Sequence, residues 1–232
     1  MTNPEQPGLA LAVLDMAGTT VTDDGLVQAA FDAALDAAGI GTDSPAEPEL
    51  RRHIRDTMGQ SKIEVFRAVF DENTAQRANR AFEQCYAGQI DTGRVAPVPG
   101  APEAITALRG AGIKVALTTG FSRDTQHRLV AALGWRDIAD LVLCPEDAGG
   151  RGRPYPDMVL TALLRLRVDD VARVAVVGDT ASDIRTGARA GASVLVGVLT
   201  GAHDGPTLRA AGATHVLPSI ADLPALLTPA LT

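Results

Sequence analysis

Short apolar segments alternate with amphipathic segments along most of the chain. The apolar segments are rich in Val, Leu and Ala and carry almost no charge, which is typical of strands that are buried on both faces. They occupy residues 9–15, 113–119, 139–144, 173–179, 192–199 and 214–218. Helical patterns lie between the later ones, at residues 123–133, 157–166, 181–190, 206–211 and 220–227. Strands alternating with helices form right-handed βαβ units, so the pattern predicts an α/β fold with a Rossmann-like, mostly parallel sheet.

The segment after the first predicted strand has a different pattern. It offers no convincing strand, but its apolar positions follow helical spacing in residues 25–38, 47–57, 61–70 and 72–90. The sequence APVPGAPE, residues 96–103, then leads back to the strand-and-helix pattern. We therefore predict a small all-helical domain at residues 22–95, which we call the cap domain. It is inserted into a core made of residues 1–21 and 96–232.

Composition restricts the classes of partner and compartment. The net charge is −7, and the Arg and Lys side chains are scattered, so no basic face for nucleic acid is expected. No apolar segment approaches the ~20 residues that span a bilayer, and the N-terminal MTNPEQPG does not resemble a secretion signal. The two cysteines have neither metal-binding spacing nor the number needed for a disulfide framework. A cytoplasmic protein without nucleic-acid or membrane partners is the expectation.

Several predicted strands end in residues suited to phosphoryl chemistry. The first ends in Asp15, the second in Thr119 and Gly120, and the fourth in Asp179. The loop after the third brings Arg153. Because ligands of parallel sheets bind outside the carboxyl ends of the strands, these groups are expected to converge. Taken singly, each could be a turn, a helix cap or a surface residue, but together they suit Mg²⁺ and a phosphoryl group.

The order of these groups, with a helical insertion after the first strand, resembles the haloacid dehalogenase superfamily. Four motifs are similar to its phosphonoacetaldehyde hydrolase (phosphonatase) branch: DMAGTTV, TTGFSRDT, GRPYPDM and GDTASDI. This resemblance covers about residues 9–227. It implies that Asp15 is the nucleophile and a Mg²⁺ ligand, with the Ala17 carbonyl and Asp179 as further ligands. Asp183 would support the metal site without binding the ion directly.

The resemblance also implies how substrate is held. Thr119, Gly120 and Arg153 would bind the phosphoryl oxygens. In the segment MGQSKIEVF, residues 58–66, Lys62 falls on the position of the phosphonatase Schiff base, and Met58 would line the pocket. Taken without the resemblance, Lys62 is more simply a solvated helix residue, and Met58 could equally belong to the core.

Ala17 stands where related phosphate-ester hydrolases carry a second aspartate. Such an acid protonates a departing alkoxide, whereas cleavage of a carbon–phosphorus bond needs an electron sink, which an imine on lysine provides. Two positions depart from the phosphonatase pattern, and the segment after TTV also differs from it. Val65 replaces a common histidine, and Phe121 replaces a tyrosine. The proton shuttle is therefore absent, mediated by water, or supplied by another residue such as His53 or Glu64.

The predicted function is therefore Mg²⁺-dependent hydrolysis of the C–P bond of a 2-oxoalkylphosphonate, by way of a Lys62 Schiff base and an Asp15 aspartyl-phosphate. A phosphate-monoester phosphatase or phosphomutase is the alternative within the superfamily. A non-catalytic binding or regulatory protein is the alternative from another class. The partner is expected to be a small phosphonate or phosphate. The apolar helix at residues 26–38 could form a homodimer seam or cover the core of the cap.

Overall fold

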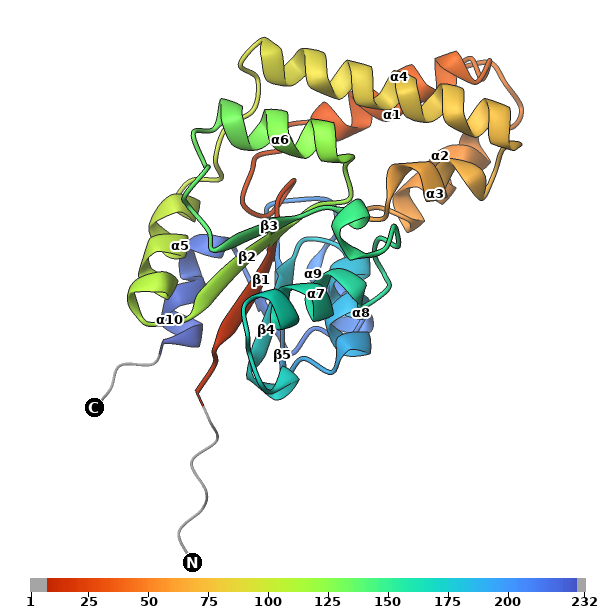
Figure 1. Ribbon diagram of the computed structural model, residues 1–232. Coiled ribbons are helices and arrows are strands. Elements are labelled where there is room, and N and C mark those ends of the chain that lie inside the picture. The colour runs from red at the N-terminus through yellow and green to blue at the C-terminus, as the bar shows by residue number, and fades with distance from the viewer. Residues whose placement is uncertain (1–7, 229–232) are drawn as a thin grey trace, which may run out of the picture.

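A central parallel sheet organises the protein, whose computed structural model describes residues 8–228. The strand order is β3-β2-β1-β4-β5-β6, and every neighbouring pair is parallel (Figure 1). The strands are β1 (Leu11–Asp15), β2 (Lys114–Thr118), β3 (Leu141–Leu143), β4 (Val174–Gly178), β5 (Val194–Val198) and β6 (His215–Leu217). The predicted Rossmann-like α/β fold is confirmed.

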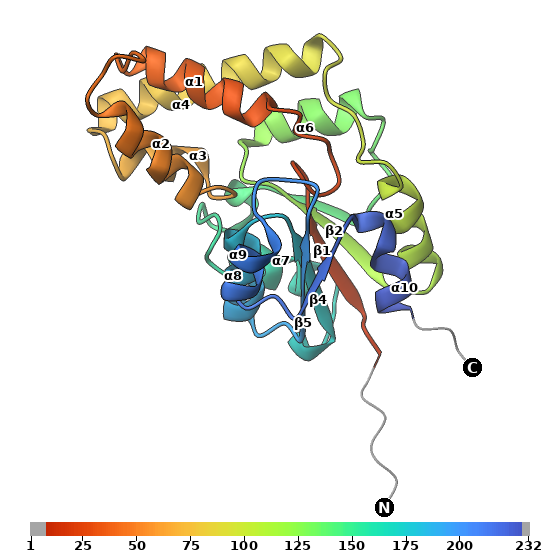
Figure 2. The same cartoon turned by 180° about the vertical axis from the view of Figure 1, so that it is seen from behind.

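Both faces of the sheet are buried, as the apolar strand segments predict. In β1, Ala12 and Leu14 belong to one hydrophobic cluster, while Leu11 and Val13 belong to another on the opposite face. This division follows from the two-residue period of a strand. Helices α5 (Ala101–Gly110), α6 (Arg123–Ala132) and α10 (Leu223–Leu227) cover the first face. Helices α7 (Asp157–Arg165), α8 (Ala181–Ala190) and α9 (Gly205–Ala210) cover the second (Figure 2).

Four helices are inserted between β1 and α5, and we call them the cap helices. They are α1 (Leu26–Ala37), α2 (Glu47–Asp56), α3 (Lys62–Arg67) and α4 (Glu72–Asp91). They lie beyond the carboxyl ends of the strands, with α6 between α4 and the sheet (Figures 1 and 2). The rings of Phe31, Phe66 and Phe82 meet edge to face, with centroids 4.9–6.4 Å apart. This aromatic cluster joins α1, α3 and α4, and it brings its apolar surface to the end of the sheet.

The apolar face of α1 is used inside the cap. Leu26, Ala30, Phe31 and Leu35 are buried against neighbouring elements, chiefly α4. The helix therefore covers the core of the cap, and the predicted homodimer seam stays a prediction. The domain boundaries at residues 21/22 and 95/96 also stay predictions. Residues 1–7 and 229–232, which were assigned to the core, lie outside the described residues, as does nearly all of MTNPEQPG.

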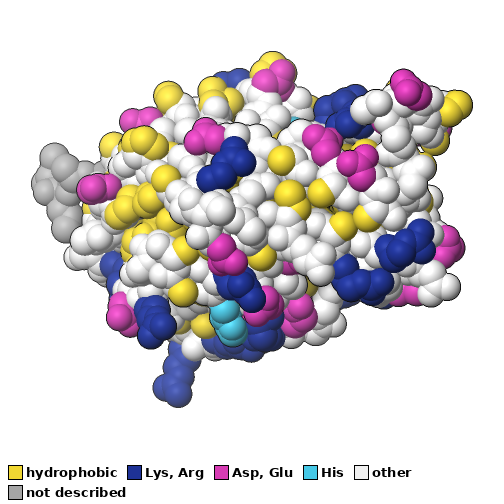
Figure 3. Space-filling view, turned by 90° about the horizontal axis from the view of Figure 1, so that it is seen from above, with side chains coloured by type: hydrophobic (Ala, Val, Ile, Leu, Met, Phe, Trp, Pro, Cys, Tyr) yellow, Lys and Arg dark blue, Asp and Glu magenta, His cyan; other side chains and the backbone are white. Residues whose placement is uncertain are grey.

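The surface carries no single dominant charge on the face that Figure 3 shows. Basic and acidic side chains alternate there with apolar ones. Within residues 8–228, no helix combines the length and the apolar character that a membrane crossing requires.

Candidate active site

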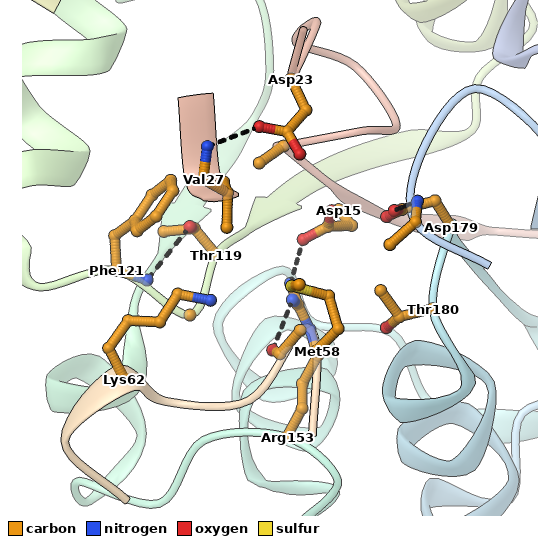
Figure 4. A pocket seen from close by; sticks show the side chains of 14 residues that line it. Asp15, Asp23, Val27, Met58, Lys62, Thr119, Phe121, Arg153, Asp179 and Thr180 are labelled. Atoms are coloured by element: carbon orange, nitrogen blue, oxygen red, sulfur yellow. Dashed lines mark hydrogen bonds and ion pairs between the residues drawn. The ribbon is translucent and has the colours of Figure 1, made fainter. Parts of the chain in front are cut away.

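The structure brings the sequence-predicted site residues together beyond the carboxyl edge of the sheet. One cavity there, with a volume of ≈ 30 Å³, is lined from the core by the ends of β1, β2 and β4 and from the cap by the segment before α3. Its lining includes Asp15, Ala17, Met58, Lys62, Thr119, Gly120, Arg153 and Asp179 (Figure 4). The cavity has room for a water molecule, which needs about 10–15 Å³. The predicted convergence of these residues is therefore observed, while the chemical role of each is a separate question.

Arg153 connects two buried carboxylates, of which Asp15 lines the cavity. Its side chain is 3% exposed, and one terminal nitrogen lies 2.5 Å from Asp15 Oδ1. Its Nε lies 2.8 Å from Asp183 Oδ1. The guanidinium also donates to Thr118 Oγ1 at 2.9 Å and to the carbonyl of Gly59 at 3.1 Å. A planar cation with five donors suits this position, because it serves two acids, a core hydroxyl and the cap at once.

Three buried carboxylates form a candidate metal centre. Oxygens of Asp15, Asp179 and Asp183 lie within 4.8 Å of one another. Burial raises the pKa of Asp15, and nearby Asp183 raises it further, against the opposing effect of Arg153. Burial also raises the pKa of Asp179 well above its ordinary value, and the other two acids add to this effect. Together with one guanidinium, the ionised set carries a formal charge of −2, which a divalent cation with oxygen ligands would neutralise.

The loop after β1 and the backbone at Ala202 lie close against the Asp179 carboxylate. The amide of Ala202 donates to Asp179 Oδ2 at 2.7 Å, and the Thr19 hydroxyl donates to Oδ1 at 3.2 Å. Gly18 has a φ of +86°, and a side chain there would clash with the Asp179 carboxylate. The glycine of the DMAGTTV motif therefore allows the loop after β1 to fold over the acid.

Lys62 is the first residue of α3, and it is buried rather than solvated. It is 5% exposed. Its Nζ lies 5.3, 5.5 and 5.6 Å from the ring centroids of Phe31, Phe82 and Phe121. Burial lowers the pKa of Lys62 to about 8, and the charge of Arg153 also lowers it, while nearby carboxylates oppose the shift. The neutral amine is therefore far more accessible at neutral pH than in a free lysine.

The cap reaches this site through the loop before α3. Gly59 has a φ of +84°, and a side chain there would clash with the Thr180 hydroxyl of the core. The backbone carbonyl of Gly59 also accepts a hydrogen bond from Arg153. Met58 precedes it and lines the cavity. The Met-Gly pair thus places Lys62 against the core because the glycine permits a tight contact.

The candidate proton carriers inferred from sequence do not face the cavity. His53 Nε2 is 3.0 Å from the Val65 carbonyl, and its ring lines a separate surface hollow beside α2. Glu64 is exposed and pairs with Arg67 at 2.8 Å. The cavity instead contains an acid that sequence reasoning missed, Asp23. It lies in the segment TDDG before α1, which by its pattern signals only a helix start.

Comparison with known proteins identifies the family. The model of the haloacid dehalogenase-like hydrolases matches residues 9–191, which is most of the chain. The chain belongs to this family. The buried acids, the arginine and the lysine described above all lie within the matched residues.

Relatives of this haloacid dehalogenase-like hydrolase include proteins of the phosphonatase branch. A phosphonoacetaldehyde hydrolase-like protein of Syntrophobacter fumaroxidans is 38% identical over 107 residues, which are 45% of this chain but only 38% of that protein. A phosphonoacetaldehyde hydrolase of Bacteroides fragilis is 28% identical over 93% of this chain and 94% of its own length. The solved structure of a phosphonoacetaldehyde hydrolase-like protein from Oleispira antarctica superposes with a TM-score of 0.80 at 26% identity, covering 95% of this chain and 91% of the other.

Proposed function

We propose that this hydrolase cleaves the carbon–phosphorus bond of a 2-oxoalkylphosphonate, with phosphonoacetaldehyde as the model substrate. The observation that carries the proposal is the position of Lys62. Its amine lies buried among three aromatic rings, lines the same cavity as Asp15 and Arg153, and has its pKa lowered to about 8. A hydrolase of simple phosphate esters has no evident use for such an amine. The names of the relatives support the same substrate class.

Lys62 would begin the reaction by forming an imine with the substrate carbonyl. The neutral amine attacks the carbonyl carbon, water leaves, and the resulting iminium ion stands one carbon away from the C–P bond. This cation is an electron sink, because the electron pair of the breaking bond can move into a carbon–carbon double bond and neutralise the nitrogen. The aromatic rings lower the polarity around the nitrogen, which favours the neutral, nucleophilic amine.

Asp15 would then attack phosphorus. A bond forms between its carboxylate oxygen and phosphorus while the C–P bond breaks, which yields an aspartyl-phosphate and an enamine. Arg153 now holds the Asp15 carboxylate at 2.5 Å, so substrate binding would transfer the guanidinium from the acid to the phosphoryl oxygens. Thr119 and Gly120, at the end of β2, would offer further hydrogen bonds to these oxygens. Water finally hydrolyses both intermediates and releases phosphate and the carbonyl product.

Ala17 fits this chemistry. It lines the cavity two residues after Asp15, so no carboxylic acid stands there to protonate an alkoxide leaving group. General acids of that kind contribute about 10²–10⁴-fold to a rate. Their loss penalises ester hydrolysis, whereas a carbanion that is delocalised through an iminium needs no such acid.

The proposal includes Mg²⁺, because the three buried acids leave a negative charge that a divalent cation would balance. Asp15, Asp179 and the carbonyl of Ala17 would hold the ion, and Asp183 would support it through its contacts with Arg153 and Thr180. When bound, such an ion neutralises charge on the phosphoryl group and the attacking acid.

Phosphate release from a matched set of substrates tests the proposal. The set comprises phosphonoacetaldehyde, its methyl ketone homologue 2-oxopropylphosphonate, and a simple phosphate monoester. We expect the wild-type protein to release phosphate from at least one of the phosphonates faster than from the ester, and Lys62→Arg to lose this activity, since arginine retains the charge but cannot form the imine. Faster ester hydrolysis, or an active Lys62→Arg variant, would instead indicate a phosphatase or phosphomutase. Release from none of the three would indicate a binding protein.

A further inference from the structure

Imine formation at Lys62 requires a proton carrier, and the residues suggested by sequence do not supply one. The ammonium must lose a proton before it attacks, and the oxygen of the carbinolamine must gain protons before it leaves as water. Val65 is buried and apolar, while His53 and Glu64 make contacts outside the cavity. A side chain that carries these protons would therefore come from elsewhere in the cavity lining.

Asp23 occupies a position that meets this requirement. It lines the cavity together with Lys62, from the loop between β1 and α1 rather than from α3. Its Oδ1 accepts a hydrogen bond from the amide of Val27 at 2.8 Å, which fixes the carboxylate in the first turn of α1. In Figure 4 the second oxygen lies on the side of the carboxylate that faces the cavity, and the Lys62 ammonium enters from the opposite wall.

The charges around Asp23 agree with this position. Burial raises the pKa of Asp23, whereas the hydrogen bond from the Val27 amide and the charge of Lys62 lower it. In turn, the negative charge of Asp23 raises the pKa of Lys62, so the two groups interact electrostatically. They form no ion pair within 4.0 Å among the described residues, so a proton would pass between them by way of a water or the substrate carbonyl oxygen. An acid with a raised pKa and a base with a lowered one can exchange a proton at little cost.

From this juxtaposition we propose that Asp23 carries the protons of imine formation and hydrolysis at Lys62. The inference rests on the proposed function and assigns the role that Val65 leaves open. Asp23 takes a proton from the Lys62 ammonium, and the neutral amine adds to the carbonyl. After a proton moves from nitrogen to oxygen, Asp23 returns its own proton to the hydroxyl group. Water leaves, the iminium remains, and Asp23 is again a carboxylate. Proton and charge therefore balance without another reactant.

The other ionisable groups near Lys62 are less suitable. Glu83 on α4 is engaged by the backbone amide and hydroxyl of Ser122 and by the hydroxyl of Thr125. The Tyr86 hydroxyl is buried without a hydrogen-bond partner among the described residues, and burial raises its pKa. A phenol with a raised pKa is a poor base near neutral pH. Asp15 is needed for the attack on phosphorus.

A rate measurement of imine formation tests the role of Asp23. The full-length protein is mixed with phosphonoacetaldehyde and borohydride, and the reduced adduct is followed by intact mass. Asp23→Asn keeps an oxygen for the Val27 amide but cannot carry a proton. We expect it to trap about 10²-fold more slowly than the wild type or worse. The control is Asp24→Asn, an exposed neighbour with a φ of +36°, where asparagine is well tolerated. It should trap at the wild-type rate.

Further variants separate proton transfer from helix capping. Thermal unfolding shows whether Asp23→Asn is folded like the wild type. If it does not unfold cooperatively at the wild-type temperature, Asp23→Ser replaces it, because serine also offers an acceptor to the Val27 amide. In Asp23→Ala, added formate should restore part of the trapping rate, which a purely structural defect would not show. If Asp23→Asn is trapped at the wild-type rate, the inference is overturned while the proposed function stays intact. Absence of trapping in the wild-type protein would overturn the proposed function, and the inference with it.

Discussion

The burial of Lys62 should be measurable as a cost in stability at neutral pH. Its pKa is about 8 in the folded protein against 10.5 for an ordinary lysine, a difference that corresponds to about 3 kcal/mol. Lys62→Met keeps an apolar chain of similar length and removes the charge. We expect this variant to exceed the wild type in unfolding free energy by about 1–3 kcal/mol at pH 7, because the lost contacts between the ammonium and the three rings reduce the gain.

The pH dependence of this difference follows from the same pKa. Below pH 8 the lysine is charged in both states, so the full cost is present. Between pH 8 and 10.5 the folded protein has released the proton and the unfolded chain still holds it. The stability of the wild type therefore rises by about 1.4 kcal/mol per pH unit relative to Lys62→Met, and the advantage of the variant shrinks.

Urea unfolding of both proteins from pH 6 to 9.5 measures this difference. Lys114→Met is the matched control, because it removes the other lysine of the chain, which is exposed and donates to the Leu166 carbonyl. It should bring no gain in stability at pH 7. The reasoning is refuted if Lys62→Met is less stable than the wild type at pH 7, or if the difference stays constant up to pH 9.5.

Three other predictions concern the site and its support. Ala17→Asp introduces an acid beside Asp15, and we expect phosphate-monoester hydrolysis to rise by about 10²-fold, measured as phosphate release. Glu83→Ala removes the acceptor that joins α4 to Ser122 and Thr125, so urea unfolding should show a loss of about 1–3 kcal/mol. Chelation of divalent cations should lower phosphate release and leave imine trapping at Lys62 unchanged; a parallel loss of both would contradict the separation of the two steps.

The core of the fold follows closely from local pattern. The strands were predictable because they are short, mainly apolar runs, and the central ones, such as β1 and β4, are buried on both faces. Helix α5 was not predicted, because APVPGAPE, with its three prolines, was interpreted only as the return of the chain to the core. In the structure Pro102 lies in the first turn of α5, where proline leaves no intrahelical hydrogen bond unmade. A proline at this position is therefore compatible with the start of a helix.

The residues of the site also divide into those that the sequence could predict and those that it could not. Asp15, Thr119 and Asp179 were predictable, since they follow parallel strands whose carboxyl ends meet at one edge. The aromatic surroundings of Lys62 were not, because Phe31, Phe82 and Phe121 come from α1, α4 and the loop after β2. Their meeting depends on how the cap docks, and no local spacing encodes that contact. Asp23 was hidden for a related reason, because an acid before a helix is ordinarily only a cap.

The central claim is that Lys62 forms an imine with the substrate. Its most direct test is borohydride reduction of the full-length protein in the presence of phosphonoacetaldehyde, followed by digestion and mass mapping of the peptides. The account predicts a reduced adduct on the peptide that contains Lys62 and none on the peptide that contains Lys114. Phosphate release from phosphonoacetaldehyde with no adduct at Lys62 would contradict it.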